Sequence, residues 1–88
     1  VLIAPNWVGQ TPWDNNVARK LAALGYAALA IDVYGKGRRG DPAGDNSHLM
    51  GPWVGDRAAL RQRLLAAVDA AAGLAQVDAN RMAIIGYC

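Results

Sequence analysis

The segment Met82-Ala83-Ile84-Ile85-Gly86-Tyr87-Cys88 joins a short apolar run to a glycine and to the one cysteine of the chain. Two further apolar runs lie upstream, at residues 1–4 and 26–33. Short apolar runs bounded by Gly or Pro are typical of strands that are covered on both faces of a parallel sheet. The sequence therefore predicts three strands, at residues 1–4, 26–33 and 82–86.

A helix is predicted between the first two strands. Thr11-Pro12-Trp13-Asp14 supplies a capping hydroxyl, a proline at the first helical position and an acid in the first turn. Gly25 is placed to end this helix as a left-handed residue.

A second helix is predicted to begin after Asp56. Its apolar face holds Leu60, Leu64, Val68 and Ala71 or Ala72, and its solvent face holds Arg57, Arg61, Arg63 and Asp69. Residues 34–55 are rich in glycine and are predicted to form a long loop, with a short helical turn near residues 49–53 inside it.

The order strand, helix, strand, helix, strand predicts an α/β fold with a parallel sheet. Because crossovers are right-handed, strand order 2-1-3 places the two helices on opposite faces of the sheet, whereas order 1-2-3 places both on one face. We expect the order 2-1-3, since it covers both faces. It opens a crevice between the C-terminal ends of the first and third strands, lined by residues 5–7 and by Tyr87 and Cys88.

Composition limits the class of protein. The chain has 88 residues, of which 53% are hydrophobic and 18% are charged, so it fits one small globular unit and excludes tandem domains. The net charge of +2 is spread along the chain, which argues against a nucleic-acid partner. The longest apolar stretch, residues 26–31, is far shorter than the ~20 residues of a membrane span.

A single cysteine cannot form an internal disulfide, and no zinc-ligand motif occurs. We therefore expect a reducing compartment such as the cytoplasm, and no metal or cofactor. Both ends of the chain lie next to apolar runs, whereas domains usually end in polar segments. Residues 1–88 are thus expected to be an incomplete part of a longer α/β domain. Two open sheet edges predict marginal stability or aggregation for this part alone.

Gly86-Tyr87-Cys88 lies where an α/β-hydrolase places its nucleophile, on a sharp turn that follows a strand. The residue two positions before such a nucleophile must be small, and Gly86 meets this need. A buried structural cysteine at the end of a strand is an equally good interpretation of the triplet alone.

Four segments together resemble the dienelactone hydrolase family of α/β-hydrolases, over the whole length of the chain and in consistent order. They are residues 4–9, residues 24–35, Val77-Asp78 with Arg81, and Ile85-Gly86-Tyr87-Cys88. The resemblance implies that Cys88 is the nucleophile that attacks an ester or lactone carbonyl of a small-molecule substrate. It also implies that the backbone N–H of Trp7 is one oxyanion-hole donor, that the other follows Cys88, and that the family's Asp and His lie beyond residue 88.

Asn6 departs from the family pattern, since members with dienelactone activity usually carry a glutamate there. An amide cannot take a proton from the thiol. Asn6 can donate a hydrogen bond to the substrate or orient the loop, and it can equally close a turn on its own backbone. The one histidine, His48, precedes Cys88, whereas the catalytic histidine of these folds comes last, so we interpret it as a solvated loop residue.

Other polar and aromatic residues allow two interpretations each. Arg38 and Arg39 can recognise an anionic substrate, although solvation is favoured for such a pair. Trp13 and Trp53 are expected to pack against the sheet, with a roof over the crevice as the alternative for Trp53. Asp32 is expected to tie down the following loop. The competing functional hypothesis is a non-catalytic ligand-binding module of flavodoxin-like or Rossmann-like topology, and a first strand at the edge of the sheet would favour it.

Overall fold

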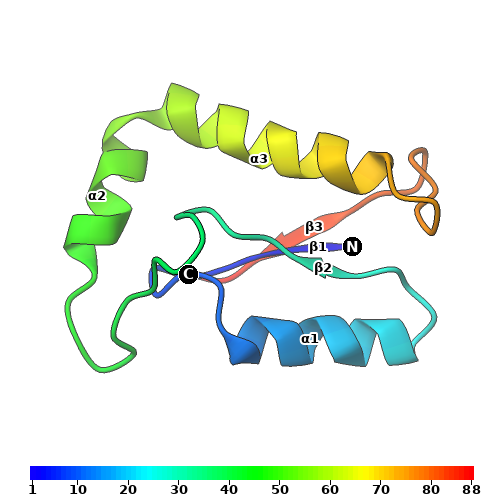
Figure 1. The fold of residues 1–88 in the computed structure, drawn as a ribbon, viewed down its shortest axis with the longest axis horizontal. Coiled ribbons are helices and arrows are strands. Elements are labelled where there is room, and N and C mark those ends of the chain that lie inside the picture. Colours follow the sequence, from blue (N-terminus) through cyan, green and yellow to red (C-terminus); the bar gives the residue numbers. More distant parts are fainter.

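The computed structural model describes residues 1–88 and contains one parallel sheet. Its strands are β1 (Leu2–Ala4), β2 (Leu29–Ala30) and β3 (Ile84–Gly86), in the order β2-β1-β3 (Figure 1). Leu2 is paired with Leu29 on one side and with Ile84 on the other. The predicted order 2-1-3 is confirmed, and the first strand is central.

Strand lengths differ from the sequence prediction. The second strand was expected over residues 26–33 and the third over 82–86, but regular pairing covers only Leu29–Ala30 and Ile84–Gly86. The central strand has three residues and so limits the ladder on both sides. In addition, the Asp32 carboxylate accepts a hydrogen bond of 3.0 Å from the Gly35 N–H, which turns the chain away from the sheet. Asp32 therefore ties down the loop, as expected.

The first helix, α1 (Pro12–Ala23), begins and ends as its sequence predicts. The Asp14 carboxylate accepts hydrogen bonds from the backbone N–H of Thr11 at 2.8 Å and from its hydroxyl at 3.0 Å. At the other end, Gly25 has φ +97, and its N–H donates to the Ala22 carbonyl. Tyr26 donates in turn to Leu21, which completes a Schellman motif and turns the chain toward β2.

The helix α3 (Arg57–Ala72) covers the opposite face of the sheet from α1 (Figure 1). The Asp56 carboxylate caps it by accepting a hydrogen bond of 3.0 Å from the Ala59 N–H. Ala71 forms the core with Leu2 and Ile31, and Leu64 and Val68 pack against that core. Helices on both faces, and the apolar face predicted for α3, are thereby confirmed.

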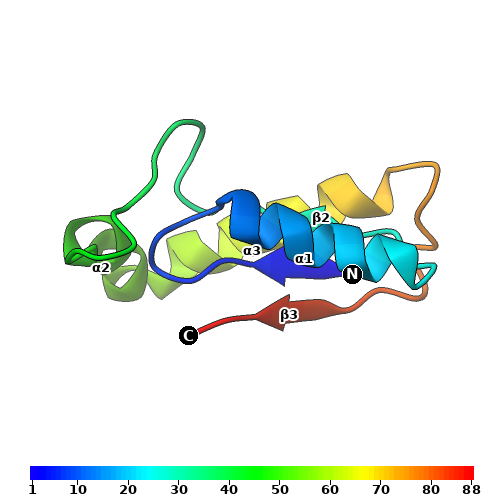
Figure 2. The same ribbon diagram turned by 90° about the horizontal axis from the view of Figure 1, so that it is seen from below.

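Residues 34–55 contain more regular structure than the predicted loop. The helix α2 (Ser47–Gly55) has nine residues in place of a short turn, and it includes Pro52. Leu49 is buried, and α2 contacts α3, so tertiary packing stabilises a segment that its Gly and Pro content marks as irregular. Both ribbon views place α2 beyond the C-terminal ends of the strands (Figures 1 and 2).

The remaining loop is anchored by Asn46, which is 1% exposed. Its side-chain amide accepts a hydrogen bond of 2.8 Å from the Asp41 N–H and donates one of 2.9 Å to the Asp41 carbonyl. Next to this pair, the Gly40 N–H donates to the Val8 carbonyl at 2.7 Å. The loop is thus held against the turn that follows β1. None of the three helices has the length and hydropathy that crossing a membrane requires.

Candidate active site

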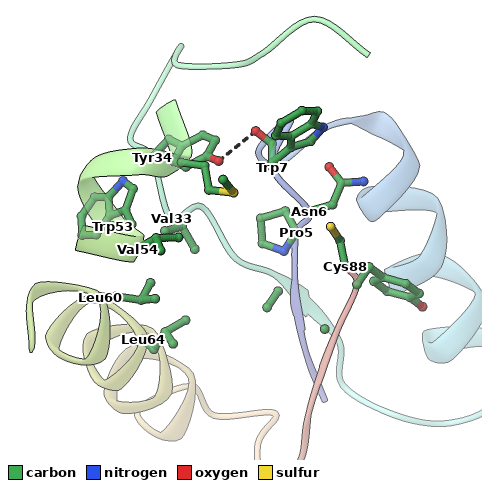
Figure 3. Close-up of a pocket in the computed structure, with 14 residues that line it drawn as sticks. Pro5, Asn6, Trp7, Val33, Tyr34, Trp53, Val54, Leu60, Leu64 and Cys88 are labelled. Carbon is green, nitrogen blue, oxygen red and sulfur yellow. Dashed lines mark hydrogen bonds between the residues drawn. The ribbon is translucent and has the colours of Figure 1, made fainter. Parts of the chain in front are cut away.

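A groove of about 530 Å³ lies at the C-terminal ends of the strands. Figure 3 shows Asn6, Trp7 and Cys88 on one side of it and Trp53, Val54, Leu60 and Leu64 on the other. The crevice predicted between residues 5–7 and residues 87–88 is therefore present. The full lining is Ala4, Pro5, Asn6, Trp7, Val33, Tyr34, Met50, Trp53, Val54, Leu60, Leu64, Gly86, Tyr87 and Cys88.

Cys88 leaves β3 with an unusual backbone conformation. Its φ is +75, and it is the one residue other than glycine with a positive φ. This region is sterically unfavourable for a residue with a Cβ, and it is where a nucleophile elbow holds its reactive residue. Cys88 is exposed among the described residues and lines the groove. A Cβ added at Gly86 would meet only Ala4, at 3.8 Å, so no residue of this chain requires glycine there.

The turn after β1 is closed by Asn6. Its side-chain oxygen accepts a hydrogen bond of 2.9 Å from the Val8 N–H, and its carbonyl accepts one of 3.1 Å from the Gly9 N–H. Of the two interpretations of Asn6, the structure therefore agrees with the one in which Asn6 closes a turn on its own backbone. The Trp7 N–H belongs to the same peptide as the Asn6 carbonyl and points the opposite way. It has no hydrogen-bond partner within the chain.

Tyr34 is a site residue that the sequence analysis missed. Its hydroxyl donates a hydrogen bond of 2.8 Å to the Trp7 carbonyl (Figure 3). Its ring fills the space beside Gly9, where an added Cβ would lie 2.9 Å from the ring. Burial raises the pKa of the Tyr34 phenol, and the charge of a Cys88 thiolate raises it further. One sequence feature could have identified Tyr34: it directly follows the predicted second strand, so it lies at the same edge of the sheet as residues 5–7 and 88.

The wall opposite Cys88 comes from α2 and α3. Trp53 lines the groove, in agreement with the alternative interpretation of this residue. Arg63 was expected on the solvent face of its helix, and it is exposed. In addition, its guanidinium lies 5.0 Å from the Trp53 ring centre and donates a hydrogen bond of 3.1 Å to the Val33 carbonyl. This contact links the two helices to the loop after β2, because a cation is attracted to the face of an indole ring.

Trp13 packs against the residue that follows β3. Its side chain is 51% exposed, and its ring meets the Tyr87 ring edge-on, with centroids 4.7 Å apart. Trp13 therefore contacts the segment that leads from β3 to Cys88. In this position Trp13 supports the residue next to the thiol.

Several charged candidates lie outside the groove. His48 is exposed and stands in the first turn of α2, not in a loop. Hydrogen bonds from Ser47 lower the pKa of the neighbouring Asp45 carboxyl, with a smaller effect from His48. Arg39 lies 3.8 Å from the Asp32 carboxylate and donates a hydrogen bond of 2.7 Å to Gln10. Neither Arg38 nor Arg39 lines the groove, and no cluster of three metal-binding side chains occurs in the chain.

Comparisons with known proteins agree with this geometry. Two solved structures resemble the chain, each at 39% sequence identity over 99% of its length. One, with a TM-score of 0.88, is described as a dienelactone hydrolase-like promiscuous phosphotriesterase from metagenomic libraries. The other, with a TM-score of 0.83, is named m3DLH. The chain spans 36% of the length of each.

No curated protein matches the chain. A model of the family described as the dienelactone hydrolase family, in contrast, matches all of residues 1–88. This result favours a hydrolase over a flavodoxin-like or Rossmann-like module. The strand order β2-β1-β3 does not separate these classes, because the flavodoxin-like order 2-1-3-4-5 also places the first strand between the second and the third. The chain belongs to the dienelactone hydrolase family.

Proposed function

We propose that residues 1–88 form the nucleophile-bearing part of a cysteine hydrolase that cleaves ester or lactone bonds of small molecules. The observation that carries the proposal is the positive φ of Cys88 at the C-terminal end of β3, in a groove shared with Trp7. An exposed thiol held at a positive φ directly after a strand is accessible to a substrate carbonyl. Family membership supports the reaction class.

In the proposed reaction the Cys88 thiolate attacks the carbonyl carbon. A C–S bond forms while the C=O electron pair moves onto oxygen, where the unpaired Trp7 N–H donates to the oxyanion. The C–O bond to the leaving group then breaks, and the alkoxide takes up a proton. Water next attacks the thioester, gives up a proton, and restores the thiolate together with a free carboxylic acid.

The proton transfers need groups outside the described residues. No side chain that lines the groove is a base suited to the Cys88 thiol, since Asn6 is an amide and His48 lies elsewhere. The resemblance implies a later His and Asp, and the solved relatives are longer than this chain. We therefore propose that residues 1–88 are an incomplete domain and inactive alone. The single cysteine has no partner for an internal disulfide, and on that ground we propose a reducing compartment such as the cytoplasm.

The experiment uses the full-length protein that carries these residues. Wild type, Cys88→Ala and Cys88→Ser are compared in the hydrolysis of a 4-nitrophenyl ester, with circular dichroism as the control for folding. We expect the alanine variant to lose hydrolysis while it stays folded, and wild type to show the mass of an acyl group on Cys88 during turnover. Retained turnover by folded Cys88→Ala would remove Cys88 from its role.

A second candidate reaction is phosphotriester hydrolysis, because a similar solved structure is described as a promiscuous phosphotriesterase. Here the thiolate would attack phosphorus, form an S–P bond and expel an alkoxide, and water would then cleave that bond. The same three proteins assayed with a 4-nitrophenyl dialkyl phosphate test this reaction. Release of 4-nitrophenol by wild type and not by Cys88→Ala supports it, and equal release by both contradicts it.

A further inference from the structure

The groove around Cys88 has an unusual charge distribution. Of its 14 lining residues, none is Asp, Glu, Lys, Arg or His. The ionisable groups among them are Tyr34, Tyr87 and Cys88, and each becomes negative when it loses its proton. The walls of the groove that residues 1–88 form therefore offer no cation to a substrate.

Cations stand on three of the segments that surround the groove, namely the loop after β2, α2 and α3, but they are not part of its lining. On the loop after β2, Arg39 is engaged by Asp32, Gln10 and backbone carbonyls, and Lys36 and Arg38 are exposed outside the groove. On α2 the one such residue, His48, is exposed and is not part of the lining.

The cations of α3 follow the same rule. The guanidinium of Arg63 is used by the Val33 carbonyl and the face of Trp53, so it braces the wall without entering the groove. Arg57 and Arg61 line a separate depression that includes Ile84. The distribution thus leaves Met50, Trp53, Val54, Leu60 and Leu64 as a wall of uncharged side chains opposite the thiol.

Such a groove discriminates between neutral and anionic substrates. A carboxylate placed against apolar side chains loses its hydration without gaining a partner, which is costly. The Cys88 thiolate would add repulsion of like charges. We infer that the uncharged wall opposite Cys88 receives an apolar acyl group and disfavours a carboxylate placed against it. The inference rests on the proposed function, because it assumes that the bond is cleaved at Cys88.

A matched pair of esters tests the inference in the full-length protein. 4-Nitrophenyl butyrate and 4-nitrophenyl hemisuccinate have acyl chains of equal carbon number and differ by a terminal carboxylate. We expect kcat/KM to be about 100-fold higher for the butyrate, from the cost of an unpaired charge. The rate with Cys88→Ala is subtracted for each ester, which also removes the spontaneous hydrolysis of the hemisuccinate.

A variant tests the physical cause. Val54 lines the groove and is 54% exposed, so a longer side chain has room there. Val54→Arg should raise kcat/KM for the hemisuccinate about tenfold, mainly through KM, because the guanidinium pairs with the carboxylate. Val54→Gln, which adds length without charge, is the matched control and should give no such gain.

The outcomes separate the inference from the proposed function. Equal or faster hydrolysis of the hemisuccinate by wild type, dependent on Cys88, overturns the inference and leaves the cysteine mechanism intact. Equal gains in the arginine and glutamine variants overturn the electrostatic cause. Absence of hydrolysis of both esters, or hydrolysis that persists in Cys88→Ala, overturns the proposed function itself.

Discussion

The Tyr34 hydroxyl donates a hydrogen bond of 2.8 Å to the Trp7 carbonyl. Tyr34, in the loop after β2, therefore restrains the turn that follows β1. The peptide on the other side of Trp7 is held by the hydrogen bond from Gly9 to the Asn6 carbonyl. Both peptides that flank Trp7 are thereby restrained. The direction of the Trp7 N–H is set before any substrate arrives, which is the condition for a preorganised oxyanion donor.

Tyr34→Phe removes this restraint and keeps the ring beside Gly9. We expect kcat for the ester to fall about fivefold with little change in KM, because the loss of one hydrogen bond, about 1 kcal/mol, weakens the placement of a donor used in the transition state. Steady-state kinetics of the full-length protein measure the effect. Tyr26→Phe, at an exposed tyrosine far from the thiol, is the control. A rise in KM alone would assign Tyr34 to substrate binding.

Ionisation of Tyr34 reports on Cys88. Burial raises the pKa of this phenol, and the Cys88 charge raises it further. Cys88→Ala should therefore lower the pKa of Tyr34 toward, but not to, its ordinary value. The difference between the alkaline absorbance titrations with and without Tyr34→Phe isolates this phenol in each background. An unchanged pKa in Cys88→Ala would show that the two side chains do not interact.

The raised pKa of Tyr34 also fixes the sign of a stability change. The folded state favours the protonated phenol, so this contribution is fully present below the phenol pKa of the unfolded chain. It is lost as pH rises through the higher pKa of the folded state. Urea denaturation across that alkaline range should show a smaller loss of stability in Tyr34→Phe than in wild type. Identical slopes in the two proteins would contradict the linkage.

Gly40 is predicted to be intolerant of a side chain. An added Cβ would overlap the amide of Asn46, which cannot move away because it is buried and holds two hydrogen bonds to Asp41. Gly40→Ala should lower the free energy of unfolding by about 1–3 kcal/mol. Gly55→Ala, where an added Cβ meets nothing within 4 Å, should stay within about 0.5 kcal/mol of wild type. Equal effects in denaturant melts would contradict the proposed overlap.

Arg63 is predicted to stabilise the wall of the groove. Arg63→Ala loses the contact with Trp53 and the hydrogen bond to Val33, which together should cost about 1 kcal/mol. The fluorescence of the full-length protein should change as well, because the guanidinium no longer covers an indole. Arg61→Ala, at an exposed residue of the same helix, is the matched control. If both variants lose the same stability, the contact with Trp53 contributes nothing.

Residues 1–88 expressed alone are expected to be marginally stable. Only 9 of 88 residues are buried, and Ile84 and Ile85 on the edge strand β3 are 48% and 37% exposed. Such a core does not offset the conformational entropy of the chain, and an apolar strand edge invites association. Calorimetry should show aggregation or no cooperative transition. A cooperative melt of a monomeric sample would be the contrary result.

Much of the fold could be predicted because local signals and topology agreed. Thr11 and Asp14 marked the start of α1, Gly25 its end, and Asp56 the start of α3, since capping depends on neighbours in sequence. The strand order followed from the handedness of crossovers. The helix α2 was underestimated because its Gly and Pro residues are poor helix formers, and burial of Leu49 outweighs that propensity.

The sequence by itself determined the family, the parallel sheet and the meeting of residues 5–7 with Cys88, because each depends on the order of elements along the chain. Only the tertiary structure decided that Tyr34 is hydrogen-bonded to Trp7 and that Arg63 contacts Trp53. It also decided that the 14 residues that line the groove include no cation. Tyr34 and Trp7 are 27 positions apart, and Arg63 and Trp53 are about ten positions apart, so each contact depends on the direction in which the side chains point. That direction is fixed by packing between elements, which no local pattern encodes.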